Sequence, residues 1–329
     1  MKKSYLILLL CLVSLSGFAR LGLNIKVNVC VVNENREPII NAKVGTSFYR
    51  FVDEKDPWKG QKSFRNYAVS DINGKCSFSE KSLNRFSVGV QKDGYYGSGK
   101  VFRLADKDLE RGRWLPYERN VELVMREIKN PIAMYAWGLH LEKYPVTTNQ
   151  WVGFDMLLAD WMPPHGLGKV EDARFQISQD LEGDGLKKPQ RVLDIEFPGA
   201  KNGLQALDDR AVSYNSHFKF PYSAPKDGYL QKNLILEKWR NQVEYKDITN
   251  IGSTNCFFRI RSKVAKNGDF VEGLYGKVQG PIDFQGRSKR LSLRMIYYVN
   301  PTPNDLNMEF DPEKNLIKKK GIRRSVIFP

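Results

Sequence analysis

The chain has 329 residues, of which 41% are hydrophobic and 27% are charged, and 52 Lys and Arg outnumber 37 Asp and Glu to give a formal net charge of +15. This hydrophobic fraction excludes a disordered chain, and the length is sufficient for two domains that each bury a core. Four cysteines are too few for a scaffold built on disulfides. The positive charge points to an anionic partner, and the location of the protein decides its chemical class.

The first nineteen residues have the three parts of a secretory signal peptide. Two lysines follow Met1, residues 5–13 form an apolar run, and small residues stand at Gly17 and Ala19. The pattern predicts cleavage after Ala19 and export to the periplasm or the extracellular space. The alternative is a membrane anchor, but the run has about half of the roughly 20 residues that a span needs. Lipidation of Cys11 is disfavoured, because Leu10 stands where a small residue is expected.

Removal of nineteen residues with two lysines leaves 310 residues and a net charge of +13. The exported chain keeps Cys30, Cys76 and Cys256, an odd number that leaves at least one thiol unpaired within the chain. Strand alternation places Cys30 opposite the valines of 27–31 and places Cys76 with Phe78 on a core face. A Cys30–Cys76 disulfide is therefore disfavoured, and we expect buried or idle thiols.

Turn signals predict a mainly β fold. Asn-Gly or Asp-Gly pairs occur at 73–74, 93–94, 184–185, 202–203, 227–228 and 267–268, and such pairs suit tight hairpins. The pair at 267–268 separates strand-like runs at 255–264 and 270–278, and 291–299 is a further strand candidate. Only two helices are expected: a short one at 104–111, and an amphipathic one at 230–245, where Ile235, Trp239 and Val243 recur at spacing four.

Residues 23–126 carry a recognisable series of motifs. A valine strand at 29–32 is followed by a turn at 35–39, Asn41-Ala42 before the next strand, Asp71-Ile72-Asn73-Gly74, and Lys92-Asp93-Gly94-Tyr95. This order resembles the carboxypeptidase regulatory-like domain, a transthyretin-like or Ig-like β-sandwich. The resemblance implies an accessory module for adhesion, docking or stability with no catalytic residues, in which Asp71 to Gly74 form a structural turn.

One stretch of this module, residues 49–67, combines lysines and arginines with Trp58, Phe64 and Tyr67. Aromatic and basic residues together are able to stack on nucleic-acid bases. The alternative is a packed surface excursion, which export favours, because an exported protein does not meet intracellular nucleic acid. We therefore expect no nucleic-acid partner.

Residues 131–329 resemble no family and are expected to form a second β-rich domain. From 150 to 200 the charge inverts, with nine acids against five bases. Within this stretch, Asp180, Glu182 and Asp184 followed by Gly185 resemble the opening of a calcium loop. The twelfth position is Arg191, where a carboxylate is needed, so a solvated turn is favoured over a calcium site.

Enzyme signatures are scarce. Three widely spaced histidines, at 140, 165 and 217, offer neither a zinc motif nor a catalytic triad. A carboxylate-pair hydrolase is the open alternative, because glycosidase acids have no fixed spacing. Its candidates are Asp155 and Asp160 as the acids and Trp151 and Trp161 as platforms for a sugar ring. The competing interpretation places these tryptophans in a core or an interface and has these acids cap turns.

The sequence therefore predicts an exported, non-enzymatic binding or structural protein of the cell envelope or extracellular space. The expected partner is polysaccharide or protein. No segment after the signal is long and apolar enough to span a bilayer. Basic residues at 318–320 and 323–324 are typical of a solvated surface and also suit peripheral contact with anionic lipid or acidic polysaccharide.

Overall fold

The computed structural model describes residues 22–53, 55–105, 109–110, 113–140, 149–179, 191–207, 215–230, 234–239, 242–246, 255–287, 290–319 and 329. The fold is mainly β, as predicted, and among these residues the only helical element is the single 3-10 turn η1 (Pro57–Lys59). The chain divides into two compact units. The first contains Met1–Ile128 with Ser213–Phe218, and the second contains Lys129–Val212 with Lys219–Pro329.

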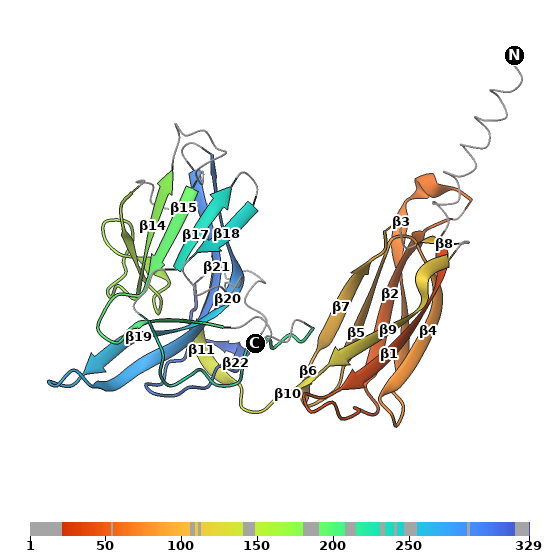
Figure 1. The fold of residues 1–329 in the computed structure, drawn as a ribbon, viewed down its shortest axis with the longest axis horizontal. Helices are drawn as coiled ribbons and strands as arrows, with labels where there is room; N and C mark the ends of the chain where they lie inside the picture. The colour runs from red at the N-terminus through yellow and green to blue at the C-terminus, as the bar shows by residue number, and fades with distance from the viewer. Residues whose placement is uncertain are drawn as a thin grey trace, which may run out of the picture. The chain divides into compact units, whose positions relative to one another are not determined.

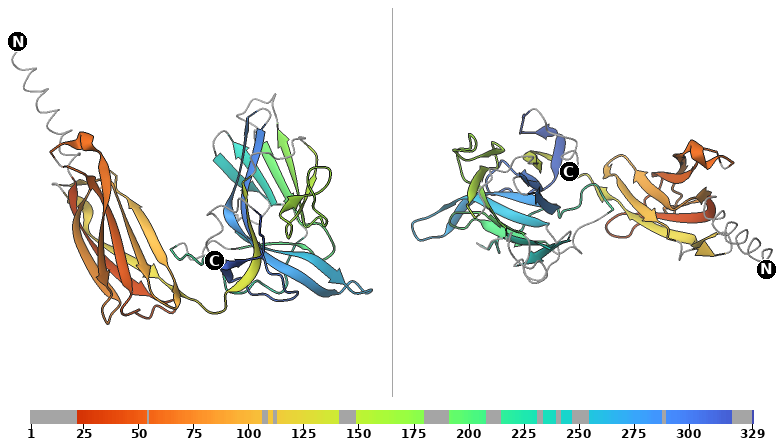
Figure 2. Two further views of the ribbon diagram at one scale, coloured as in Figure 1. Left: turned by 180° about the vertical axis from the view of Figure 1, so that it is seen from behind. Right: turned by 90° about the horizontal axis from the view of Figure 1, so that it is seen from above.

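The first unit is a β-sandwich whose strands form two four-stranded sheets (Figure 1, Figure 2). One sheet has the order β4-β1-β9-β8, with β1 (Leu23–Val32), β4 (Lys75–Ser82), β8 (Leu109–Glu110) and β9 (Arg113–Val124). The other has the order β3-β2-β5-β7, with β2 (Lys43–Phe51), β3 (Gln61–Val69), β5 (Arg85–Gln91) and β7 (Ser98–Arg103). A further pair joins β6 (Tyr95–Tyr96) to β10 (Arg126–Glu127).

The core of this unit follows from strand alternation. Val27 and Val29 of β1 are buried together with Phe48 and Phe86 of the facing sheet, and every second residue of these strands points outward. The rings of Phe48 and Phe86 stack with centroids 5.8 Å apart. Both sheets therefore keep one face in the core and leave the other face as an outer surface.

Asp71 forms the structural turn that the sequence predicts. Its Oδ1 accepts hydrogen bonds from the backbone N–H groups of Asn73 and Lys75 at 2.9 and 2.8 Å. Gly74 has a φ of +70°, and a Cβ at this position would overlap the carbonyl oxygen of Val31. Both features explain why glycine ends this turn.

The thiols are unpaired, as expected for the three cysteines in the described residues. In the β1–β4 register Val29 faces Cys76 and Cys30 faces Lys75. Directly opposed residues share one face of a sheet. Cys76 therefore lies on the core side with Val29, and Cys30 lies on the outer side.

The second unit contains two six-stranded sheets. The first has the order β16-β19-β20-β21-β11-β22, with β11 (Ile132–His140), β16 (Gly203–Ala206), β19 (Cys256–Val264), β20 (Phe270–Arg287), β21 (Arg290–Val299) and β22 (Phe310–Asn315). The second has the order β13-β12-β14-β15-β17-β18, with β12 (Val152–Asp155), β13 (Asp160–Trp161), β14 (Ala173–Gln179), β15 (Arg191–Glu196), β17 (Leu234–Trp239) and β18 (Gln242–Lys246). Phe154 and Phe175 of one sheet and Phe258 and Tyr297 of the other share one core.

The hairpin predicted around Asn267-Gly268 is confirmed, because β19 pairs antiparallel with β20 from Cys256↔Val278 to Val264↔Phe270. The helix predicted over 230–245 is wrong. Leu236 of β17 pairs with Leu193 on one side and Tyr245 on the other, so this stretch extends a sheet. Spacing-four apolar residues do not reveal that two neighbouring strands are available to complete a ladder.

The short helix expected at 104–111 is also not formed where the structure describes this stretch. The backbone N–H of Leu104 donates to the carbonyl of Asn84, and Leu109–Glu110 is the two-residue strand β8. No helix among the described residues is long and apolar enough to cross a membrane.

Candidate functional site

The two predicted acids lie side by side but differ in environment. Asp155 and Asp160 face each other in the β12–β13 pair. Asp155 is 1% exposed, and its two oxygens accept four backbone hydrogen bonds at 3.0 to 3.1 Å, from residues 157, 158, 169 and 170. Asp160 accepts the backbone N–H of Trp161 and lies 3.3 Å from Lys319 Nζ.

A third acid, Asp172, joins Asp155 through a shared arginine. Arg261 Nε and Nη2 each donate to Asp172 at 2.8 Å, and Nη2 also reaches Asp155 Oδ1 at 3.0 Å. Burial raises the pKa of Asp172 despite these bonds. Burial also acts to raise the pKa of Asp155, but its backbone donors and Arg261 outweigh that effect and hold the pKa below its usual value.

This arrangement is a structural cross-link. A general acid or base must come within hydrogen-bond distance of its substrate, whereas the Asp155 and Asp172 side chains are 1% and 0% exposed. Arg261 ties the loop around Asp155 to strand β19. The geometry of Asp155 and Asp160 therefore gives no support to the hydrolase alternative.

The two predicted tryptophans also have different surroundings. Trp161 is buried, and its ring packs edge-on against Phe154 at 5.1 Å and Phe175 at 5.8 Å between centroids. Trp151 is half-buried under the guanidinium of Arg174, which lies 5.0 Å from the centre of a Trp151 ring. Trp161 is thus a core residue, and Trp151 carries a cation–π contact.

The calcium candidates Asp180, Glu182 and Asp184 lie outside the described residues. Among the residues that the structure does describe, no group of three His, Cys, Asp or Glu side chains is placed to hold a metal ion.

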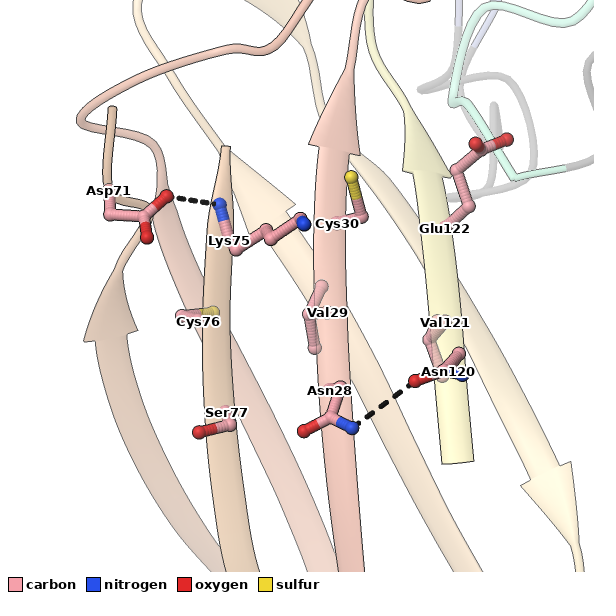
Figure 3. A pocket seen from close by; sticks show the side chains of 10 residues that line it. All are labelled: Asn28, Val29, Cys30, Asp71, Lys75, Cys76, Ser77, Asn120, Val121 and Glu122. Carbon is pink, nitrogen blue, oxygen red and sulfur yellow. Dashed lines mark hydrogen bonds between the residues drawn. The ribbon is translucent and has the colours of Figure 1, made fainter. Parts of the chain in front are cut away.

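The described residues of the first unit form grooves on both of its outer faces. The larger, of about 690 Å³, crosses β4, β1 and β9 (Figure 3). It is lined by Asn28, Val29, Cys30, Asp71, Lys75, Cys76, Ser77, Asn120, Val121 and Glu122. The lining combines two acids, two amides and one lysine, and several of these side chains bond to one another or to neighbouring residues. Asn28 Nδ2 donates to Asn120 at 3.2 Å and to Glu118 at 3.3 Å, and Arg36 pairs with Glu122.

The second groove, of about 380 Å³, crosses the outer face of β3, β2, β5 and β7. Tyr67, Gly45, Gly89 and Gly99 stand in one row across the four strands, because each faces the next in the strand register. The three glycines leave the floor of the groove without side chains. We call this groove the glycine trough. Besides the row, it is lined by Lys43, Val90, Gln91, Gly97, Ser98 and His217.

An aromatic ring stands at each end of the glycine trough. The Tyr67 ring lies over Gly45 so closely that a Cβ there would be 3.1 Å from a ring carbon, yet Tyr67 is 61% exposed. At the other end, the His217 ring lies over Gly97 at a similar distance. His217 reaches this position because its backbone N–H donates to the Gly97 carbonyl at 2.8 Å.

The glycine trough lies in a field of one sign. Strands β2, β3, β5 and β7 contain no acid, and they carry seven bases: Lys43, Arg50, Lys62, Arg65, Arg85, Lys100 and Arg103. The register places four of them on the outer face with Tyr67: Lys43, Arg65, Arg85 and Arg103. The Nζ of Lys43 is 5.1 Å from the Tyr67 ring centroid.

Sequence reasoning singled out Tyr67 only as part of a basic aromatic stretch and did not identify the three glycines. The signal for the positive field is readable, since four strand-like stretches without an acid stand between 43 and 103. The row of glycines depends on strand register, and His217 comes from more than a hundred residues away. Neither the row of glycines nor the position of His217 is therefore indicated by neighbouring residues in the sequence.

Comparisons with known proteins identify no family. No family model matches the chain, so the resemblance of residues 23–126 to the carboxypeptidase regulatory-like family stays a prediction. No curated protein matches it.

Solved structures match at low TM-scores. They include 3-chlorocatechol 1,2-dioxygenase from Rhodococcus opacus 1CP, with 10% identity, 32% of this chain, 61% of that chain and a TM-score of 0.25. A streptococcal ancillary pilin matches with 8% identity over 83% of this chain and 58% of that chain, at a TM-score of 0.21. The major pilin SpaD from Corynebacterium diphtheriae matches with 11% identity over 85% of this chain and 82% of that chain, at a TM-score of 0.24. This chain spans less than two thirds of the length of the dioxygenase and of the ancillary pilin. With such TM-scores the matches define neither a family nor a function.

Proposed function

We propose that this chain is an exported, non-enzymatic binding protein of the cell envelope or extracellular space, and that the glycine trough holds an acidic polysaccharide. The observation that carries the proposal is an exposed tyrosine ring on a sheet face that has four outward bases and whose strands contain no acid.

Three features of the glycine trough suit such a ligand. The exposed face of Tyr67 offers an apolar surface to the C–H groups of a pyranose ring. The floor at Gly89 and Gly99 lets a chain approach the sheet backbone closely. Lys43 and Arg65 provide the positive field that attracts carboxylate or sulfate groups. The mixed groove of Figure 3 lacks this combination, because its lining has two acids, two amides and one lysine but no aromatic ring.

The test measures binding of the purified protein to polygalacturonate, with dextran as the neutral polysaccharide. We expect binding to polygalacturonate only, and a loss of affinity of about tenfold for Tyr67→Ala, as for an interface residue that carries much of the binding energy. Gly89→Val fills the floor and should weaken binding by a similar factor. A Cβ at Gly89 meets only the Ser98 carbonyl oxygen at 3.7 Å, an ordinary contact, and urea unfolding checks that the Gly89→Val variant keeps its fold.

Ser77→Val is the matched control, because it adds an exposed branched side chain to an outer strand in the mixed groove. It should leave polygalacturonate binding unchanged. Equal binding by wild type and Tyr67→Ala, with complete loss in high salt for both, would show attraction by charge alone and refute the trough as the site.

A further inference from the structure

We propose that the outer edge of β3 pairs with an extended acidic segment of a partner protein, which adds a strand to the sheet β3-β2-β5-β7. Strand β3 ends this sheet, and in the described part of the chain no strand or isolated bridge pairs with its outer side. It is nine residues long and contains no proline. The backbone groups along such a sheet edge are a template for another strand.

The strand register shows which backbone groups of β3 would meet an added strand. At one end of the β2–β3 ladder the Val52 N–H donates to the Gly60 carbonyl, and at the other end the Ser70 N–H donates to the carbonyl of residue 42. Bonded and non-bonded pairs alternate along an antiparallel ladder, so the even-numbered residues of β3 bond to β2. The backbone groups directed away from β2 therefore belong to Gln61, Ser63, Arg65, Tyr67 and Val69.

The opposite edge of the same sheet is closed by the chain itself. The Gly99 N–H of β7 donates to the Asn215 carbonyl at 2.6 Å. The His217 N–H donates to the Gly97 carbonyl at 2.8 Å. A short extended segment thus pairs with β7, whereas the described residues provide no such segment for β3.

Charge selects an acidic partner for β3. The strand contains Lys62 and Arg65 and no acid, and neither base forms an ion pair with a described residue. The described acids that adjoin β3 are engaged by other groups. Glu80 of β4 pairs with Arg50 at 3.4 Å, and the two described acids of the turn before β3 both pair with Lys59. An acidic strand therefore supplies the counter-charge that Arg65 does not find within its own sheet.

The same charges disfavour a second copy of this chain as the added strand. Arg65 is the central residue of β3. In a full-length antiparallel pair of two β3 strands, it would face the same arginine of the other copy. Like charges directly opposite each other destabilise a ladder.

The two faces of β3 define the side-chain pattern of the partner strand. Arg65 and Tyr67 are exposed on the outer face, whereas Phe64 and Ala68 are half-buried on the inner face, where Ala68 packs against the core. Side chains of paired strands meet on the same face. The partner segment therefore alternates acidic residues beside Arg65 with apolar residues beside Phe64 and Ala68.

The proposal goes beyond polysaccharide binding at the glycine trough, and a labelled peptide tests it. The probe is a fluorescent peptide of alternating valine and glutamate with capped ends, matched to the nine residues of β3. It is titrated with the purified protein and followed by fluorescence anisotropy, and a valine–lysine peptide of the same length is the charge control. We expect the glutamate peptide to bind and the lysine peptide not to bind.

Two substitutions of Ser63 separate pairing with the backbone from attraction by charge. Ser63→Pro removes an outward N–H and puts a ring carbon in the path of the added strand, and an edge strand accepts proline where this N–H faces solvent. Affinity for the glutamate peptide should fall at least about tenfold, because a carbonyl of the peptide loses its donor. Ser63→Ala is the matched control: it keeps the N–H, removes only the hydroxyl that bonds to Ser47, and should bind like wild type.

Further variants keep the two proposals separate. Gly89→Val, in the floor of the glycine trough, should leave peptide binding unchanged. Ser63→Pro should leave polygalacturonate binding unchanged, which also shows that this variant is folded. Arg65→Glu reverses the charge at the centre of β3, so it should weaken binding of the glutamate peptide at least about tenfold and allow the lysine peptide to bind.

Three outcomes would overturn the proposal. Equal binding of the glutamate peptide by Ser63→Pro and Ser63→Ala would show attraction by charge alone. Wild-type affinity in Arg65→Glu would show that the central base does not select the partner. A wild-type dimer in analytical ultracentrifugation that Ser63→Pro dissociates would assign the edge to a second copy of this chain.

Discussion

Replacing Arg261 with methionine should strongly destabilise the second unit. Arg261 bonds to both Asp155 and Asp172, through three hydrogen bonds of 2.8 to 3.0 Å. Methionine keeps much of the apolar stem but leaves two buried carboxylates without this counter-charge. The backbone φ of +52° at Arg261 does not contribute to the difference, because both residues carry a Cβ.

The expected loss is about 3 kcal/mol in the free energy of unfolding at neutral pH. Removal of one partner from a buried ion pair typically costs about 3–5 kcal/mol. The lower end applies because the Arg261 side chain is 28% exposed, so water screens part of the interaction. The matched control is Lys263→Met on the same strand, whose Nζ pairs with Glu272 while the lysine side chain is 73% exposed. That change should cost less than about 1 kcal/mol.

The pH dependence gives a second, independent check. The lowered pKa of Asp155 contributes stability that is present above its unfolded pKa and is lost as the pH falls through its folded pKa. The raised pKa of Asp172 has the opposite sign, since ionisation of the buried carboxyl costs stability as the pH rises. Without Arg261 each carboxyl loses an interaction that lowers its pKa, so each takes up its proton at a higher pH than in wild type. The difference between wild type and Arg261→Met should therefore shrink as the pH falls toward about 4.

Urea unfolding followed by tryptophan fluorescence, at neutral pH and near pH 4, measures both effects. The reasoning fails if Arg261→Met loses no more stability than Lys263→Met at neutral pH. It also fails if the loss stays constant or grows in acid.

Three further changes test the packing. Gly276→Ala should cost about 2–4 kcal/mol in urea unfolding, because a Cβ there would overlap the Phe258 ring and lie 2.5 Å from a backbone oxygen, whereas Gly89→Ala should stay within about 0.5 kcal/mol. Burial raises the pKa of the Cys256 thiol to about 12, so iodoacetamide should label it only after unfolding; labelling of the native protein, read by mass spectrometry, would contradict this. Ser70→Ala should cost about 1–3 kcal/mol, because its buried hydroxyl accepts one backbone bond at 2.8 Å and donates another at 2.7 Å.

Local signals predicted the parts of the fold that depend on neighbouring residues. The hairpin at Asn267-Gly268 and the turn at Asp71 each require only a few adjacent residues of the right type, and both were predicted correctly. The prediction of a helix over 230–245 was wrong, because β17 pairs with β15, which lies some forty residues earlier in the chain.

The site residues show the same limit. Asp155 was identified as a noteworthy acid, but its environment depends on Asp172 and on Arg261, which lies 106 residues away. A sequence pattern does not separate an acid that meets substrate from one that closes a cross-link. The glycine trough was missed because Gly45, Gly89 and Gly99 become neighbours only through strand register.

The contacts of the charged side chains show where the excess positive charge lies among the described residues. Acids of the stretch 150–200 are matched by bases within the second unit: Asp155 and Asp172 by Arg261, Asp160 by Lys319, and Glu196 by Arg174 at 2.8 Å. The four strands around the glycine trough contain no acid to match the four bases on their outer face, whereas Arg50 pairs with Glu80 of β4 at 3.4 Å. Like charges on one sheet face repel and destabilise the isolated unit. A polyanion bound there removes this repulsion, so polygalacturonate should raise the unfolding midpoint of the first unit in low salt.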